Sequence, residues 1–310
     1  MRKATMLLAV IGLGLPIVSA LPAQALSDRT WVSGLGTNSG ACTQAAPCAT
    51  FQFALNQTNA GGEINCVDAG SYGILTISKS ITISCEAGTA GIQVVADAGV
   101  GISISAAATD VVTLRGLDID GLGTGAIGII ASTVKEVHIE KCSIRNFRAN
   151  GGSVALRTFG AGSATIFLFV VDAVLSDNAN GITLPSGGGF KVLSVKNAII
   201  TGSTSDGIQL PNSNTFANIT ESIISGNGGS AVNVAAASST ANIDRTTMAN
   251  NGAALTSAGS GATIRTIGNN IFNNTSAFVF SGGGIIASDG QNRTGGNTNG
   301  QDPNASVTLK

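Results

Sequence analysis

The sequence predicts an all-β chain that winds into a stack of parallel coils. Glycine supplies 42 of its 310 residues and charged residues only 11%, whereas hydrophobic residues reach 43%. This composition is typical of chains rich in strands and turns, and it disfavours disorder and long helices. A repeat of about two dozen residues and a column of charges that alternate in sign support the same fold.

The chain begins with the features of a secretory signal. Arg2 and Lys3 precede an apolar run from Met6 to Val18, and Ala23-Gln24-Ala25 supplies small residues for cleavage after Ala25. The apolar run is shorter than the roughly 20 residues that a membrane-spanning helix needs. We therefore expect a signal peptide over residues 1–25, and a mature chain that is secreted or periplasmic and has no membrane span.

The five cysteines would meet an oxidising compartment, in which disulfides form. Cys42 and Cys48 flank a short loop that contains a proline, and we expect a disulfide that clips this loop. Cys66 and Cys85 each follow an isoleucine by two residues, so each shares a strand face with that isoleucine. If the two strands are neighbours, their spacing of about 4.8 Å allows a disulfide. Cys142 then remains a free thiol.

The repeat becomes visible when apolar residues of successive coils are placed in one column. That column contains Ile119, Ile144, Leu175, Ile199, Ile224, Met248 and Ile271, with steps of 25, 31, 24, 25, 24 and 23 residues. We assign the longest step to a loop near Thr158 to Ala164. Three residues after the column stand residue types that suit a tight corner and a stacked amide ladder: Asn178, Gly202, Asn227, Asn251 and Asn274.

A second column, three residues before the apolar one, contains charges that played no part in the alignment. It reads Gly116, Lys141, Asp172, Lys196, Glu221, Arg245 and Asn269. Its five successive charges alternate in sign. Opposite charges on neighbouring strands attract by roughly 0.2 to 1 kcal/mol per pair, whereas like charges repel. The alternation therefore predicts parallel, in-register coils with ion pairs between successive rungs.

The start of the chain carries a further set of motifs, Trp31-Val32-Ser33-Gly34, Pro47-Cys48-Ala49-Thr50-Phe51 and Gly61-Gly62-Glu63-Ile64. Together with the coils, these motifs resemble secreted bacterial proteins with the right-handed parallel β-helix of the pectin-lyase-like superfamily. The resemblance implies a short N-terminal capping helix, for which Thr50 is suited as the N-cap. We expect a cap over residues 26–60 and a parallel β-helix over residues 61–310, with a polar loop near 290–304 before the last strand.

Several functional classes are disfavoured by composition and motifs. A formal net charge of −1 provides no basic surface for nucleic acid. The hydrolases of the superfamily resemble one another through Asn-Thr-Asp, Asp-Asp, Gly-His-Gly and Arg-Ile-Lys, and none of these occurs here. Glu136, His138 and Glu140 alternate with apolar residues, so we expect them on a solvated strand face and expect no zinc site.

One constellation combines carboxylates with a candidate base. Asp118 and Asp120 share a strand face beside Arg145, and Arg148 follows three residues later. The resemblance to lyases of the superfamily implies that the two carboxylates would hold Ca²⁺ and that Arg145 or Arg148 would be the catalytic base. The alternative is a cluster of ion pairs between rungs, which we favour because the same 25-residue offset pairs charges elsewhere.

Aromatic residues form only 4% of the chain, so a platform of rings for sugars is poorly supplied. Phe147, Phe159 and Phe190 can lie on loops, whereas we expect Phe167 and Phe169 to fill the bore of the stack.

These observations favour a non-catalytic, monomeric β-helix that binds a polysaccharide or another component of the cell envelope and needs no cofactor. The alternative is a polysaccharide lyase, or another carbohydrate-active enzyme of the superfamily, for which Ca²⁺ would be the cofactor.

Overall fold

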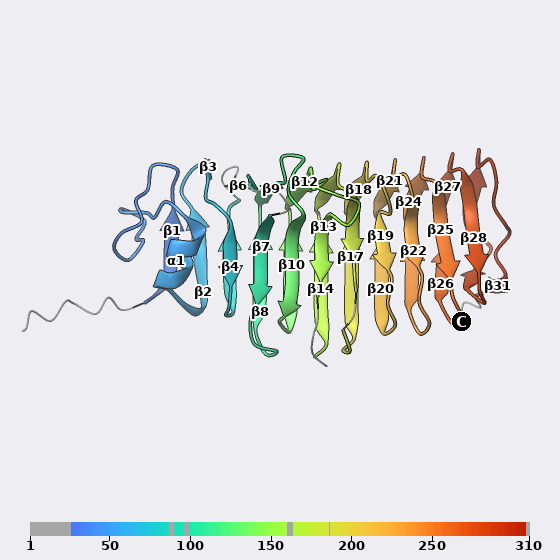
Figure 1. Ribbon diagram of the computed structural model, residues 1–310, viewed down its shortest axis with the longest axis horizontal. Helices are drawn as coiled ribbons and strands as arrows, with labels where there is room; N and C mark the ends of the chain where they lie inside the picture. The colour runs from blue at the N-terminus through green and yellow to red at the C-terminus, as the bar shows by residue number, and fades with distance from the viewer. Residues whose placement is uncertain (1–25, 87–89, 96–98, 160–163, 186, 308–310) are drawn as a thin grey trace, which may run out of the picture.

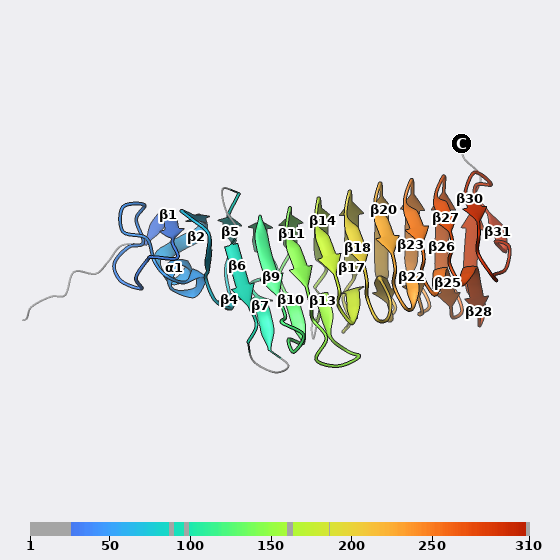
Figure 2. The same cartoon turned by 90° about the horizontal axis from the view of Figure 1, so that it is seen from above.

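The chain forms an elongated stack of coils, with α1 (Phe51–Gln57) near its N-terminal end (Figure 1). The computed structural model describes residues 26–86, 90–95, 99–159, 164–185 and 187–307. The expected signal peptide and part of the expected loop near Thr158 to Ala164 lie outside these residues. Viewed from above, successive coils follow one another along a single axis (Figure 2).

Each full coil contributes one strand to each of three parallel sheets, which contain twelve, ten and nine strands within the described residues. The first sheet contains β1 (Ser27–Val32), β2 (Thr58–Cys66), β5 (Ile81–Ser84), β8 (Val111–Arg115), β11 (Glu136–Glu140), β14 (Ile166–Val171), β17 (Lys191–Lys196), β20 (Thr215–Thr220), β23 (Thr240–Asp244), β26 (Thr263–Ile267), β29 (Ile285–Ser288) and β31 (Ala305–Ser306). The second sheet contains β3 (Gly70–Ser71), β6 (Ala90–Gln93), β9 (Leu117–Asp120), β12 (Ser143–Arg145), β15 (Val174–Ser176), β18 (Ile199–Thr201), β21 (Ile223–Ser225), β24 (Thr247–Ala249), β27 (Asn270–Phe272) and β30 (Arg293–Gly295). The third sheet contains β4 (Leu75–Ile77), β7 (Val100–Ser105), β10 (Ile127–Thr133), β13 (Val154–Thr158), β16 (Asn180–Thr183), β19 (Ile208–Leu210), β22 (Ser230–Val234), β25 (Ala253–Ala258) and β28 (Ser276–Ser281).

The core is a continuous apolar bore, because alternate side chains of every sheet point inward. In the second sheet the inward column runs through Ile119, Ile144, Leu175, Ile200, Ile224, Met248 and Ile271, all fully buried. The placement of Ile199 in this column was wrong, because Ile200 faces inward and Ile199 remains 40% exposed. Ile199 and Ile200 are equally apolar, so hydrophobicity alone could not show which of the two faces inward.

The corner between the first and second sheets is a single residue with left-handed backbone. It is occupied in successive coils by Gly116, Lys141, Asp172, Asn197, Glu221, Arg245 and Gly268, with φ between 46° and 69°. Lys196 and Asn269, expected in this column, each lie one position away from it. Lys196 instead ends β17, opposite Val171 and Thr220.

The expected charge ladder is present only in its second half. Glu221 Oε1 lies 3.1 Å from Arg245 Nη2, and Glu221 Oε2 lies 3.7 Å from Lys196 Nζ. Asp172 accepts a hydrogen bond from Asn197 Nδ2 at 2.7 Å, and within the described residues it forms no ion pair with Lys141 or Lys196. The prediction of a continuous alternating ladder was therefore wrong, because an amide occupies one of its five positions.

The corner between the second and third sheets contains the expected amide ladder. Its buried positions are Asn178, Ser203, Asn227, Asn251, Asn274 and, less deeply, Asn297, and each backbone N–H from Ser203 to Asn274 donates to the side-chain oxygen of the next coil. Gly202 was placed in this ladder incorrectly. It lies one residue earlier, where its φ of 67° provides the left-handed turn before the ladder position.

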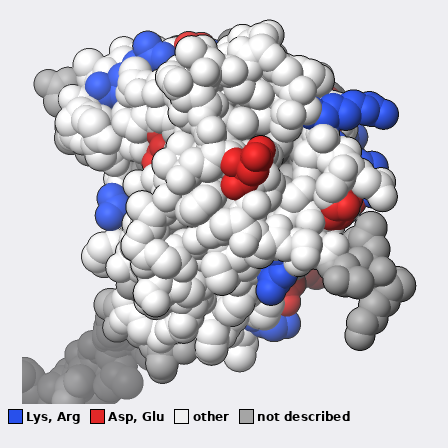
Figure 3. Space-filling view, turned by 90° about the vertical axis from the view of Figure 1, so that its right-hand side faces the viewer, with Lys and Arg blue, Asp and Glu red and all other residues white. Residues whose placement is uncertain are grey.

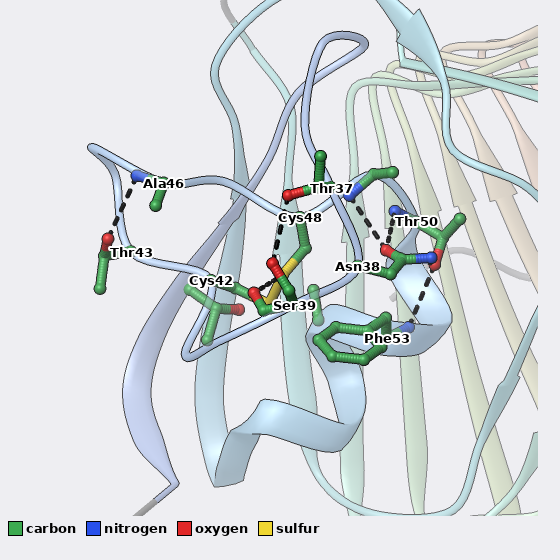
Figure 4. The surroundings of a disulfide bond; sticks show 12 residues. Thr37, Asn38, Ser39, Cys42, Thr43, Ala46, Cys48, Thr50 and Phe53 are labelled. Carbon is green, nitrogen blue, oxygen red and sulfur yellow. Dashed lines mark hydrogen bonds between the residues drawn. A yellow bond between two sulfur atoms is a disulfide. The ribbon is translucent and has the colours of Figure 1, made fainter. Parts of the chain in front are cut away.

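The N-terminal end is closed by α1, as the resemblance implied. Thr50 is the N-cap, and its side chain accepts a hydrogen bond from the backbone N–H of Phe53 at 3.3 Å. Asn38 Oδ1 accepts from the backbone N–H groups of Ala49 and Thr50 at 3.0 and 3.1 Å (Figure 4). These contacts join the preceding loop to the start of the helix.

Both expected disulfides are formed. Cys42 and Cys48 close the loop before α1 with a Cα–Cα distance of 4.9 Å (Figure 4). Cys66 and Cys85 also have a Cα–Cα distance of 4.9 Å and join the ends of the neighbouring strands β2 and β5. Cys142 is a buried free thiol. A disulfide-bonded chain is consistent with an oxidising, extracytoplasmic compartment.

The C-terminal end of the stack presents mainly uncharged atoms with isolated charged side chains (Figure 3). The strand β30 lies inside the stretch 290–304, and β31 then pairs with β29. Among the described residues, no helix is long and apolar enough to cross a membrane.

Candidate functional site

The structure brings Asp118, Asp120 and Arg145 together on the outer face of the second sheet. Asp120 lies directly opposite Arg145 in the pairing of β9 with β12. Arg145 Nη2 lies 3.0 Å from Asp120 Oδ2, and Arg145 Nη1 donates to Asp118 Oδ1. The hydrogen bond that Arg145 donates to Asp118 and the charges of both carboxylates raise the pKa of Arg145. A general base must be able to lose its proton, so this environment opposes the role of Arg145 in catalysis.

Arg148 lies apart from this cluster. Its Nε donates to the carbonyl oxygen of Asp177 at 2.6 Å, and its Nη2 donates to the carbonyl oxygen of Gly202 at 3.0 Å. Nη2 also lies 3.3 Å from Asp177 Oδ1. Arg148 therefore links the two following coils instead of approaching Asp118 or Asp120.

The two carboxylates do not fit a calcium site. Asp120 Oδ1 already accepts hydrogen bonds from the Leu122 backbone N–H at 2.8 Å and from Asn146 Nδ2 at 3.0 Å, while Oδ2 faces Arg145. Calcium requires six to eight oxygen ligands, and a guanidinium beside both carboxylates competes with any cation. Among the described residues, no group of three or more His, Cys, Asp or Glu side chains is placed to hold a metal.

The side chains of Glu136, His138 and Glu140 share the outer face of β11. His138 Nε2 lies 3.4 Å from Glu136 Oε2, and Lys135 Nζ lies 2.8 Å from Glu136 Oε1. The hydrogen bond from Lys135 lowers the pKa of Glu136. Glu140 instead faces Arg115 at 3.6 Å, so the three polar residues of β11 belong to two separate ion-pair groups.

Phe167 and Phe169 lie on the outer face of the first sheet, so their expected placement in the bore was wrong. In β14 the inward residues are Ile166, Leu168 and Val170, which are almost fully buried. The six residues of this strand are all apolar, and alternation of hydrophobicity therefore could not reveal its phase. Alignment with β11 could have done so, because Val137 and Ile139 alternate with polar residues and pair with Leu168 and Val170.

The outward placement of these rings creates a band that we call the aromatic strip, consisting of His138, Phe167, Phe169, Phe190 and Phe216. The His138 and Phe169 rings are stacked, with centroids 4.6 Å apart and an interplanar angle of 10°. The Phe190 and Phe216 centroids are 5.9 Å apart. Phe190 is 49% and Phe216 37% exposed, so this end of the strip presents apolar surface to solvent. Of the other phenylalanines considered for loops, Phe159 is exposed, whereas Phe147 is buried in a corner.

A column of amides continues the strip toward the C-terminal coils. Phe169 is followed in register by Ser194, Asn218, Asn242 and Arg265. Asn242 Nδ2 donates to Asn218 Oδ1 at 2.9 Å, and Arg265 Nη1 donates to Asn242 Oδ1 at 3.2 Å. Amide groups retain further donor and acceptor capacity after one such bond. The face thus combines apolar rings with polar groups that can bind hydroxyls.

The three parallel sheets, the apolar core and the capping helix define a parallel β-helix. Pectate lyase Pel9A has a similar solved structure, with a TM-score of 0.56 and 14% identity over 92% of this chain and 78% of that chain. The A-module of mannuronan C-5 epimerase AlgE4 from Azotobacter vinelandii also matches, with a TM-score of 0.43 and 14% identity over 81% of this chain and 91% of that chain. No family model and no curated protein sequence matches the chain. The likeness to Pel9A establishes the fold.

Proposed function

We propose that this protein is a secreted or periplasmic, non-catalytic β-helix that binds a polysaccharide along the outer face of its first sheet. The observation that carries the proposal is the exposure of Phe190 and Phe216 at one end of the aromatic strip, beside the amides of Asn218 and Asn242. Sugar rings have apolar C–H faces and polar edges, and sites with aromatic walls and a few amides suit such ligands.

The charges around the strip favour neutral sugars over acidic ones. Glu136 lies opposite Phe167 at one end of the strip. Lys135 already forms an ion pair with this carboxylate, with its Nζ 2.8 Å from Glu136 Oε1. Recognition would rest on ring contacts and amide hydrogen bonds. The engagement of Asp118 and Asp120 with Arg145 supports a binding function over the lyase alternative, because the guanidinium competes with any cation for these carboxylates and is itself held in its protonated form.

The test is binding of the mature protein to immobilised polysaccharides, using a neutral β-glucan, a neutral mannan and acidic polygalacturonate. We expect the double variant Phe190→Ala with Phe216→Ala to lose roughly tenfold or more in affinity for the neutral polymer that binds, on the scale of aromatic contacts. Ile223→Ala is the matched control, because Ile223 is an exposed apolar residue on the second sheet.

Three results would contradict the proposal. They are failure to bind any of the three polysaccharides, equal binding by the aromatic double variant, and appearance of unsaturated sugar products that absorb in the ultraviolet. The third result would restore the lyase alternative. Measuring the Tm of each variant separates a loss of binding from a loss of folding.

A further inference from the structure

A second polar site lies on a different face, the outer surface of the third sheet. A hollow of about 460 Å³ extends over β13, β16 and β19, with Gly151 and Gly152 at one margin and Pro185 and Pro211 at the other. Arg157, Thr183 and Gln209 form a single column across it, since Arg157 pairs with Thr183 and Thr183 pairs with Gln209. The hollow therefore presents a cation, a hydroxyl and an amide at consecutive rungs.

The Arg157 guanidinium has neither an ion pair nor a hydrogen bond to the described residues, and Arg157 is partly buried, unlike the similarly unpaired but exposed Arg293. Its Nε is shielded from solvent and has no hydrogen-bond partner. The guanidinium carbon lies 5.9 Å from the centre of the exposed Phe159 ring. A shielded donor without a partner costs free energy, so the fold keeps this group available at some expense in stability.

The acidic residue of the hollow does not neutralise Arg157. Asp206 Oδ1 accepts a hydrogen bond from the Ser230 backbone N–H at 2.7 Å, and its Oδ2 accepts one from Asn233 Nδ2 at 2.9 Å. Asn233 continues the column beyond Gln209, and its own Oδ1 is a second shielded atom without a partner. Two of the unpaired buried polar atoms of the described residues thus belong to one column.

We propose that this hollow binds a small carboxylate that also carries hydroxyl groups. The planar guanidinium of Arg157 matches the two oxygens of a carboxylate. Thr183 and Gln209, whose side chains form no hydrogen bonds with described residues, bind the hydroxyls together with the remaining acceptor capacity of Asp206. A singly charged carboxylate matches the single cation Arg157, whereas the carboxylate of Asp206 would repel a doubly charged phosphate about twice as strongly.

The proposal is independent of polysaccharide binding by the aromatic strip, because the two sites lie on different sheets. The experiment titrates the mature protein with D-glucuronate, D-glucose and acetate by calorimetry. Glucuronate carries both groups, glucose lacks the carboxylate and acetate lacks the hydroxyls. We expect glucuronate to bind, and glucose and acetate to bind at least about tenfold more weakly.

Substitution then assigns the binding to the hollow. Arg157→Gln is expected to weaken glucuronate binding by about 10- to 100-fold, the range for loss of a hydrogen bond to a charged group. Arg293→Gln on β30 removes an exposed cation that has no ion pair with the described residues, and this variant should leave the affinity unchanged. Gln209→Ala is a second variant of the hollow, and backbone amide shifts in β13, β16 and β19 should accompany binding.

Several outcomes would overturn the inference. They are absence of glucuronate binding, equal affinity of the Arg157→Gln variant with an unchanged Tm, and equal affinity for glucose or acetate. Loss of glucuronate binding on Phe216→Ala, with Arg157→Gln unaffected, would place the ligand on the aromatic strip instead.

Discussion

Asn251 donates a hydrogen bond from its Nδ2 to Oδ1 of Asn274 in the next coil at 3.0 Å, and both side chains are almost fully buried. The backbone N–H of Asn251 donates to the same oxygen at 2.9 Å, while Nδ2 also reaches the carbonyl oxygen of Ile224 at 3.0 Å. The two amides therefore satisfy backbone groups of two successive coils at a corner from which water is excluded. Such buried networks stabilise only when every member has a partner.

The first prediction concerns this ladder. Asn251→Ala removes the acceptor of both the backbone N–H and the Nδ2 of Asn227, so buried donors lose their partners. We expect the free energy of unfolding to fall by about 3 kcal/mol. Asn242→Ala is the control, because its amide bonds lie on the exposed outer face and their loss should cost less than about 1 kcal/mol. Urea denaturation measures both, and equal losses would contradict the role of burial.

The second prediction tests which side chains of β18 face the core. Ile200 is fully buried in the bore and Ile199 is 40% exposed. Ile200→Ala should destabilise the protein by about 2–5 kcal/mol through lost apolar burial and a cavity, whereas Ile199→Ala should cost less than about 1 kcal/mol. Chemical denaturation of the two variants checks this order. The reverse order would restore the register expected from the sequence.

The third prediction concerns the ion pairs of Glu221 with Lys196 and Arg245. Glu221→Lys would place three cations in neighbouring coils, and we expect a loss of about 1 kcal/mol at low salt, because these side chains are largely exposed. The loss should shrink as ionic strength rises. Asp302→Lys makes the same charge change at an exposed position that has no ion pair within the described part of the chain. If both variants lose the same free energy of unfolding, or if the loss does not depend on salt, the ion pairs of Glu221 do not stabilise the stack.

The fourth prediction concerns Cys142. Burial raises the pKa of this thiol from 9.0 to about 12. Because the pKa is raised in the folded state, ionisation of the thiol favours the unfolded state. The contribution of the protonated thiol to the free energy of unfolding is therefore complete below about pH 9 and is lost as the pH rises toward 12. Cys142→Ala should remove this part of the pH dependence, and alanine fits because Ala173 and Ala198 occupy the same column in the following coils.

The measurement compares the free energy of unfolding of the wild type and Cys142→Ala at about pH 8 and about pH 10. The wild type should lose more stability than the variant on this change. A thiol reagent should also find one group in the unfolded, unreduced protein and almost none in the native one. Rapid reaction in the native state, or identical pH profiles, would contradict burial of the thiol.

Local sequence patterns were sufficient to predict much of this architecture. The isoleucine spacing before Cys66 and Cys85 placed both cysteines correctly, and Thr50 was identified as the N-cap of the helix that the resemblance implied. The contact of Asp120 with Arg145 followed from a constant 25-residue offset. These features depend on periodicity or on adjacent residues, both of which a linear sequence records.

The aromatic strip and the Arg157 hollow were decided only by the tertiary structure. The phase of an all-apolar strand such as β14 depends on its neighbours, because hydrophobicity is equal on both of its faces. The hollow combines Arg157 with Gln209, which lie 52 positions apart in the chain and two rungs apart in the third sheet. The sequence by itself determined the repeat and the parallel stack, since both depend on residues at a nearly constant spacing, and it determined the two disulfides from the residues beside each cysteine. Which side chains meet on each outer face depended on the lengths of individual corners, where a shift of one residue exchanges the inside of a strand for its outside.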